Sequence, residues 1–182
     1  MIPIVKSWLI GMAGLLLLAA PLQQAQAASP KTIKVNKTVL IAAEPAAVWD
    51  RIKDFNGLHT WHPGFTNAEI VKGSNNQVGA VRKLTLKDGP SFTEDLLVYS
   101  AAKHTMRYHI IESPLPVQVY VSSITVTPGK SKGTSLVTWH GSFKRKKADN
   151  PGPDETDAAV TKLITGVYEA GLGNLKKLAE SK

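Results

Sequence analysis

The segment Ala47 to Pro63, AVWDRIKDFNGLHTWHP, constrains the fold more than any other, because it predicts two short helices near the start of a strand-rich chain. Four apolar residues recur at helical spacing and form one face of the first helix: Val48, Trp49, Ile52 and Phe55. Pro63 disfavours helix at the preceding residue, so the helix pair should end at Trp61 and His62. This order of elements narrows the choice of fold considerably.

Alternating apolar and polar residues predict seven strands, at 32–42, 67–72, 78–86, 92–100, 104–112, 117–127 and 134–143. The links between the last five strands are short, as in an antiparallel meander. Acidic residues then precede apolar residues at helical spacing, which continue to Leu178 and predict one long helix. We therefore expect an α+β domain in which this helix lies across the sheet and buries its apolar stripe.

The first 27 residues have the pattern of a secretory signal peptide. Lys6 supplies the basic part, residues 9–20 supply the apolar part, and Ala25-Gln26-Ala27 is a small-x-small cleavage site. An apolar run of about a dozen residues is shorter than the roughly twenty that a membrane span needs, although an uncleaved anchor is the alternative. We expect cleavage after Ala27, a periplasmic domain of residues 28–182, and no stable membrane insertion of that domain.

The composition narrows the partners and the types of site. The chain has no cysteine, so it forms neither disulfides nor thiolate metal sites. Without Lys6, 21 Lys and Arg stand against 14 Asp and Glu, which leaves a charge of about +7 and favours anionic partners. Nucleic acid is not expected outside the cytoplasm, so an acidic protein or an anionic lipid is the better candidate. The densest basic run, Lys144 to Lys147, is either a docking patch or a solvated hairpin end.

Several short pieces of the chain carry a family resemblance: AVWDRIKDF, WHP, Gly79-Ala80-Val81-Arg82, Phe92-Thr93-Glu94-Asp95-Leu96, Tyr108-x-Ile110-x-Glu112, Trp139-x-Gly141-x-Phe143 and residues 168–178. Together they resemble the START-related (SRPBCC) superfamily of helix-grip proteins, and in particular its polyketide cyclase and dehydratase branch. With the leader in front, the chain is most similar to the periplasmic MxaD-like accessory proteins of methanol oxidation. The resemblance implies a curved antiparallel sheet wrapped around a long C-terminal helix, two short helices after the first strand, and a cavity between helix and sheet.

Strand alternation selects the side chains that would face this cavity, if the larger apolar set is turned toward the helix. Val98 falls on this inward side. The predicted ligand-binding residues, with one at the rim and the rest on strands, are Trp61, Arg82, Phe92, Glu94, Tyr108, Glu112, Tyr120, Trp139 and Phe143. Such a lining suits a small hydrophobic ligand with a polar tip.

Arg82 and Glu94 lie on strands joined by a short hairpin, so they should pair across it. A buried glutamate without such a partner would take up a proton. We interpret the pair first as a structural ion pair that closes the cavity and does no chemistry. The alternative makes Glu94 or Glu112 a general base, with Tyr108 or Tyr120 as a hydrogen-bond donor.

The sequence Trp61-His62-Pro63 is the other candidate site. A tryptophan beside a proline on a loop is commonly a packing plug, whereas a partner-facing anchor is the functional alternative. His59 and His62 could share a face, but no third ligand is spaced to join them, so neither a metal nor a cofactor is predicted.

Three glycines lie within the final helix, at positions 166, 171 and 173. Each costs about 0.5–1 kcal/mol relative to alanine in a helix interior. They therefore indicate either close contact with the sheet or a helix that moves as a gate, and we expect close contact.

Three functions from different classes remain. The first, implied by the resemblance and favoured by the charge, is an accessory protein that docks to methanol dehydrogenase or its acidic cytochrome partner. The second is a carrier of a small hydrophobic or lipid-like ligand. The third, a polyketide cyclase or dehydratase, has the least support, because fold does not determine function.

Overall fold

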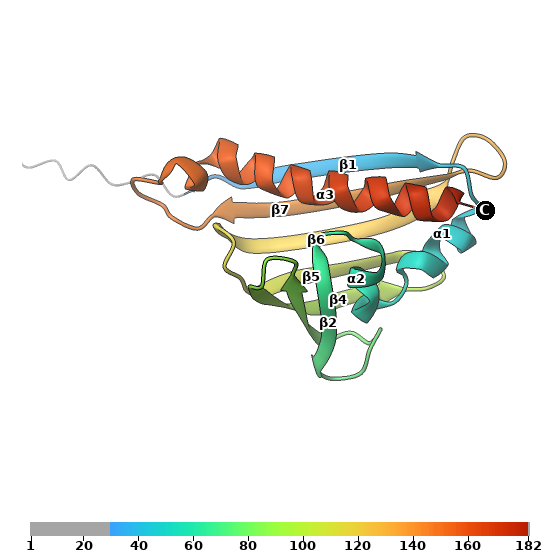
Figure 1. Ribbon diagram of the computed structural model, residues 1–182, viewed down its shortest axis with the longest axis horizontal. Helices are drawn as coiled ribbons and strands as arrows, with labels where there is room; N and C mark the ends of the chain where they lie inside the picture. The colour runs from blue at the N-terminus through green and yellow to red at the C-terminus, as the bar shows by residue number, and fades with distance from the viewer. Residues whose placement is uncertain (1–29, 182) are drawn as a thin grey trace, which may run out of the picture.

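The computed structural model describes residues 30–181, so the predicted leader, residues 1–27, lies outside the described residues. Seven antiparallel strands form one curved sheet in the order β1-β7-β6-β5-β4-β3-β2 (Figure 1). The strands are β1 Ile33–Ile41, β2 Phe65–Lys72, β3 Val81–Leu86, β4 Ser91–Ser100, β5 Thr105–Glu112, β6 Val117–Pro128 and β7 Ser135–Arg145. The predicted helix-grip fold is confirmed.

Two short helices follow β1, and one long helix closes the chain. The helical elements are α1 Pro45–Ile52, η1 Phe55–Gly57, α2 Leu58–Trp61, η2 Pro153–Glu155 and α3 Asp157–Glu180. Figure 1 shows α3 lying alongside β1 and β7, with α1 near the C-terminal end of α3 and α2 beside β2. No helix within residues 30–181 is both long enough and apolar enough to cross a membrane.

The helix α3 begins where the sequence supplies a cap. The Thr156 side chain accepts a hydrogen bond from the backbone N–H of Ala159 at 3.1 Å, which satisfies one of the free donors of the first turn. One side of the helix then faces the sheet and is buried at Val160, Ile164, Tyr168, Gly171, Leu172 and Leu175. This stripe holds α3 in place mainly by burial of apolar surface.

Register shifts break the alternation that the sequence predicts at several places in the sheet, two of them between β4 and β5. In β4 the register changes between Leu96 and Val98, and Val98 is 41% exposed, so the prediction that it faces the helix is wrong. In β6 the register changes between Gln118 and Val121, around a residue at φ 52°. A bulge places two residues opposite one, so the strand changes faces at a point that hydrophobic alternation does not mark.

One of the three glycines of α3 lies in close contact with the sheet. A Cβ atom at Gly171 would lie 2.5 Å from His62 Cδ2 and 2.7 Å from Trp139 Cζ3, so the expected close contact is confirmed there. At Gly166 and Gly173 a Cβ atom would meet no described atom within 4 Å, so close contact does not explain these two positions.

Candidate ligand-binding cavity

A cavity of about 160 Å³ lies between α3 and the concave face of the sheet. Three residues of the helix close one side, namely Leu163, Ile164 and Val167. Most of the other lining side chains are aliphatic or aromatic, and the rest of the lining comes from α2, the six strands β2 to β7 and the β5–β6 loop. Only three polar side chains reach the cavity: Glu94, Tyr108 and Tyr120.

The structure brings five of the nine predicted ligand-binding residues to this cavity: Phe92, Glu94, Tyr108, Tyr120 and Trp139. Arg82 lies behind Glu94 and does not line the cavity, and Phe143 is buried against the ring of Tyr120. The predictions for these two residues are corrected from ligand contact to support of the lining.

Glu112 requires a larger correction. It lies at the end of β5, is exposed, and does not line the cavity. Simple alternation places Glu112 inward, but the β4–β5 register shifts between the Glu94–Ile110 and Thr93–Glu112 pairs, so Glu112 lies opposite Thr93 and not on the inward face of Glu94. The hypothesis that Glu112 acts as a general base on a cavity ligand therefore has no geometric support.

The sequence-based prediction missed several residues that close the cavity. They are Leu58 of α2, Phe65 of β2, Leu86 at the end of β3, Leu115 of the β5–β6 loop, and the three α3 residues named above. The helical stripe could have indicated the α3 residues, because apolar positions four apart share a helix face. No comparable periodicity marks Leu115, which lies in a loop.

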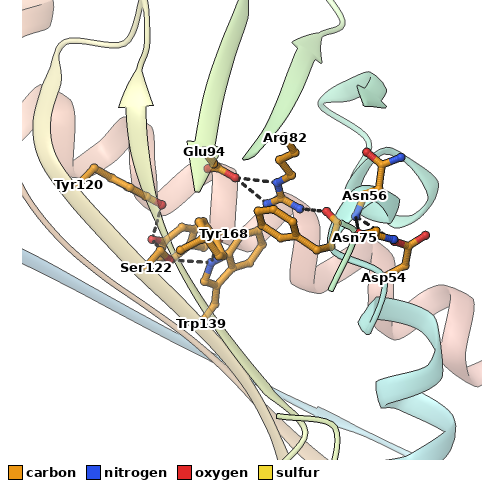
Figure 2. A network of polar contacts seen from close by, with 11 residues as sticks. Asp54, Asn56, Asn75, Arg82, Glu94, Tyr120, Ser122, Trp139 and Tyr168 are labelled. Atoms are coloured by element: carbon orange, nitrogen blue, oxygen red, sulfur yellow. Dashed lines mark hydrogen bonds and ion pairs between the residues drawn. The ribbon is translucent and has the colours of Figure 1, made fainter. Parts of the chain in front are cut away.

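Arg82 and Glu94 form the predicted pair across the β3–β4 hairpin, where they occupy directly opposed positions. Arg82 Nε and one terminal nitrogen donate to the same carboxylate oxygen, Glu94 Oε2, at 2.9 and 2.6 Å. The other terminal nitrogen donates to the backbone carbonyl of Phe55, and the guanidinium carbon lies 4.1 Å from the centre of the Phe55 ring (Figure 2). Glu94 of the neighbouring strand thus holds the Arg82 guanidinium on one side, and Phe55 holds it on the other.

Burial raises the pKa of the Glu94 carboxyl, although the positive charge of Arg82 and its hydrogen bonds oppose this rise. Both side chains are almost completely buried, so each needs the other for compensation. The second carboxylate oxygen, Glu94 Oε1, forms no hydrogen bond within residues 30–181. Glu94 therefore presents an unused acceptor at the cavity wall.

A chain of hydroxyl groups lies beside the carboxylate (Figure 2). The Tyr120 and Tyr168 hydroxyls are 2.6 Å apart, and the Tyr168 hydroxyl is 2.9 Å from Ser122 Oγ. Trp139 Nε1–H donates to Ser122 Oγ at 3.0 Å and to the Tyr108 hydroxyl at 2.8 Å. The Trp139 and Tyr168 rings stack with a centroid distance of 4.5 Å, which fixes this network against α3.

Burial keeps the phenols of this network protonated. Burial is the main reason that the pKa of Tyr108 and that of Tyr120 lie well above the ordinary value. Burial also raises the pKa of Tyr168 to about 12. At neutral pH these groups can therefore donate or accept hydrogen bonds, but they cannot act as bases.

Trp61 and His62 are buried rather than displayed on a rim. Trp61 is 5% exposed and its ring lies 5.5 Å from that of Trp139, which favours a packing role over a partner-facing anchor. The Gly64 backbone N–H donates to His62 Nδ1 at 3.0 Å, so Nε2–H donates to the Val167 carbonyl at 2.9 Å. Burial lowers the pKa of His62, which is held in this neutral tautomer.

The comparison with known protein families gives one match. The model described as "Polyketide cyclase / dehydrase and lipid transport" matches residues 32–180. The chain belongs to this polyketide cyclase, dehydrase and lipid transport family. No curated protein sequence matches the chain significantly.

Solved structures agree with this family assignment. An uncharacterised protein from Bacillus thuringiensis is 29% identical with a TM-score of 0.72, and the match covers 82% of this chain and 100% of that one. The protein XoxI from Bacillus cereus is 30% identical with a TM-score of 0.70, over 80% of this chain and 94% of that one. Zhui aromatase/cyclase from a Streptomyces species has a TM-score of 0.70 at 18% identity, over 82% of this chain and 94% of that one, which shows a shared fold alone.

The site of this polyketide cyclase and lipid transport family member has a lining that can hold and orient a small ligand. The cavity combines an apolar wall with a carboxylate acceptor and two phenols, a combination that orients a ligand. Within residues 30–181, no group of three or more His, Cys, Asp or Glu side chains could hold a metal ion. Of the carboxylates within residues 30–181, Glu94 alone lines the cavity, and Arg82 donates to one of its two oxygens.

Proposed function

We propose that this protein binds a small, mainly apolar molecule that carries a hydroxyl or similar hydrogen-bond donor. The observation that carries the proposal is Glu94 Oε1, an acceptor without a protein partner in the described chain, at the wall of an otherwise apolar cavity. A ligand donor that reaches this oxygen forms a hydrogen bond to a charged group, which is among the stronger kinds. A ligand without a donor leaves the oxygen unsatisfied.

The size of the cavity sets the class of ligand. An apolar protein cavity of about 150 Å³ is large enough for benzene. A cavity of about 160 Å³ therefore suits a molecule built on a single ring or a chain of similar volume. A larger lipid-like ligand would require α3 or the neighbouring loops to move outward.

The experiment that tests this proposal is native mass spectrometry of the purified protein under gentle conditions, with bound small molecules then identified. Val167→Phe places a ring where the helix lines the cavity and should abolish ligand retention. Ala170→Phe is the matched control, because Ala170 is exposed on the same helix and does not line the cavity. Protein that stays free of ligand, or equal retention by both variants, would contradict the proposal.

A cyclase-like activity is a second candidate because the pKa of Glu94 is raised toward the range of a general base. Glu94 would take a proton from the bound molecule, and Tyr108 or Tyr120 would donate to the developing oxyanion. Turnover of a hydroxylated aromatic or polyketide-like substrate, lost in Tyr108→Phe with binding retained, would support it. Binding without any turnover favours the carrier role.

The finer biological setting is also a proposal. The sequence resemblance to MxaD-like proteins and the excess of basic residues support a periplasmic role in methanol oxidation, with docking to the dehydrogenase or its acidic cytochrome. A pull-down from periplasmic extract should recover these proteins at low salt and lose them at moderate salt. Absent or salt-independent recovery would contradict this setting and would leave the binding proposal intact.

A further inference from the structure

Three cations lie on the outer face of the sheet, the face turned away from α3, and a fourth follows directly after β7. We call these four residues the outer basic face: Lys34, Arg107, Lys144 and Lys146. Lys34, Lys144 and Arg107 each follow or precede a buried inward residue on their strand, so they point outward. None of the four forms an ion pair with a carboxylate of the described residues. Their charge is available to a partner.

The basic run at the end of β7, residues 144–147, contains two residues that form ion pairs and two that do not. Arg145 pairs with Asp157 at 2.9 Å, and Lys147 pairs with Glu155 at 3.3 Å, so these two secure the start of α3. Lys144 lies opposite Gln118 of β6, and the backbone N–H of Lys146 donates to the Pro116 carbonyl. Lys144 and Lys146, the two lysines of this run without an ion pair, therefore lie close to the β5–β6 loop.

The sheet divides at this same place. The β5–β6 ladder ends at His109 and Val121, whereas β6 continues along β7 as far as the pairing of Val117 with Arg145. A cleft of about 460 Å³ opens between the separated strand ends. Ile110 and Tyr120 line both this cleft and the ligand cavity, so these side chains lie between the two.

Aliphatic side chains protrude at the cleft. Val119 is 65% exposed and Ile111 is 49% exposed. Val119 also has φ 52°, a backbone region that β-branched residues rarely adopt. The bulge therefore holds an apolar side chain in solvent at a conformational cost, beside unpaired lysines.

We propose that the outer basic face docks on an anionic lipid bilayer, with Val119 and Ile111 entering the interfacial region. The four cations have no carboxylate partner among the described residues, and each lysine or arginine near an anionic bilayer surface contributes about 1 kcal/mol of attraction. The exposed aliphatic residues add apolar contact, as in other proteins that bind the interface.

Docking in this orientation turns the cleft toward the hydrocarbon interior of the bilayer, where an apolar ligand dissolves. This part of the inference rests on the proposed binding function, because a ligand from the bilayer would enter the cavity by passing between the side chains of Ile110 and Tyr120. Glu112 also lines the cleft and reduces the excess positive charge there by one, so binding should be reversible and sensitive to salt.

Co-sedimentation with vesicles tests the inference. The protein should bind vesicles of phosphatidylcholine and phosphatidylglycerol in equal parts, and should not bind phosphatidylcholine alone. Lys144→Gln and Lys146→Gln should each weaken binding about fivefold, the usual effect of one cation near an anionic surface. Lys130→Gln and Lys132→Gln are matched controls in the exposed β6–β7 turn and should have little effect.

Val119→Asn tests the apolar contact, because asparagine tolerates a positive φ and should preserve the bulge. It should weaken vesicle binding, whereas Val78→Asn, at a valine that is 66% exposed in the β2–β3 turn, should not. Failure to bind anionic vesicles, equal binding to neutral vesicles, or capture of an acidic protein without vesicle binding would overturn the inference. Val167→Phe should leave vesicle binding unchanged, so a failure of the cavity proposal is distinguishable from a failure of this one.

Discussion

At the scale of single residues, the site depends on a buried ion pair and on a buried neutral histidine. Because these groups are buried, substitutions at them should have large effects on stability. Arg82 and Glu94 were predictable as a pair, because both lie inward on strands joined by a short hairpin. Their use of one carboxylate oxygen was not predictable, since it depends on the Phe55 carbonyl, which orients the guanidinium from a distant part of the chain. The unused oxygen that defines the proposed ligand is therefore a property of the tertiary structure.

Removing one partner of the Arg82–Glu94 pair should lower the free energy of unfolding more than replacing both partners with apolar residues. Glu94→Gln leaves the Arg82 charge buried without a counter-ion and should lower the free energy of unfolding by about 3–5 kcal/mol. The double variant Arg82→Met, Glu94→Leu removes both charges and should recover most of that loss. Urea denaturation of the three proteins measures both effects, and equal stability of Glu94→Gln and the parent would contradict the buried-pair interpretation.

His62 should make stability depend on pH. Burial lowers the pKa of His62 in the folded protein, whereas the unfolded chain has a value of about 6.5. Between these two values the unfolded chain binds more protons, so stability is lost as the pH falls through this window, by at most about 1.4 kcal/mol per pH unit. Denaturation midpoints of the parent and His62→Asn between pH 7.5 and 5 should differ in slope, and parallel curves would argue against this role.

At the scale of elements, local patterns predicted the strands and helices well, and bulges were the main failures. Every predicted strand exists, because a half-buried sheet imposes period-two alternation on its strands. The faces of Val98 and Glu112 were mispredicted, because a register shift between β4 and β5 directly precedes each of these residues and changes the face on which it lies. The helix pair after β1 was found from its apolar spacing, but the burial of Trp61 depends on contact with Trp139 of a distant strand.

The glycines of α3 give a test at this scale. Gly171→Ala should destabilise the fold by about 1–3 kcal/mol, because the added methyl would overlap the His62 and Trp139 rings. Gly166→Ala and Gly173→Ala are matched controls on the same helix, where nothing lies within 4 Å, and each should stabilise by about 0.5–1 kcal/mol. Thermal unfolding separates the two outcomes, and a stabilising Gly171→Ala would show that α3 is not packed tightly there.

At the scale of the whole molecule, the fold positions a cavity with a single polar corner. The curved sheet and α3 enclose an apolar space, and the pairing of β3 with β4 places a carboxylate at its wall (Figures 1 and 2). The resemblance in sequence predicted this architecture. The cleft between β5 and β6 and the contribution of Leu115 could not be predicted, because both depend on where the strands separate in space.

The most direct test of the account is a titration of the protein with 4-methylphenol and with toluene, followed by NMR shifts of residues around the cavity. Both ligands fit a single-ring site, but only 4-methylphenol can donate to Glu94 Oε1. We predict shifts at Phe92, Tyr120 and Val167 for both ligands, with 4-methylphenol at least about tenfold tighter, and loss of binding in Val167→Phe but not in Ala170→Phe. Equal affinities, shifts elsewhere on the protein, or no binding of either ligand would contradict the account.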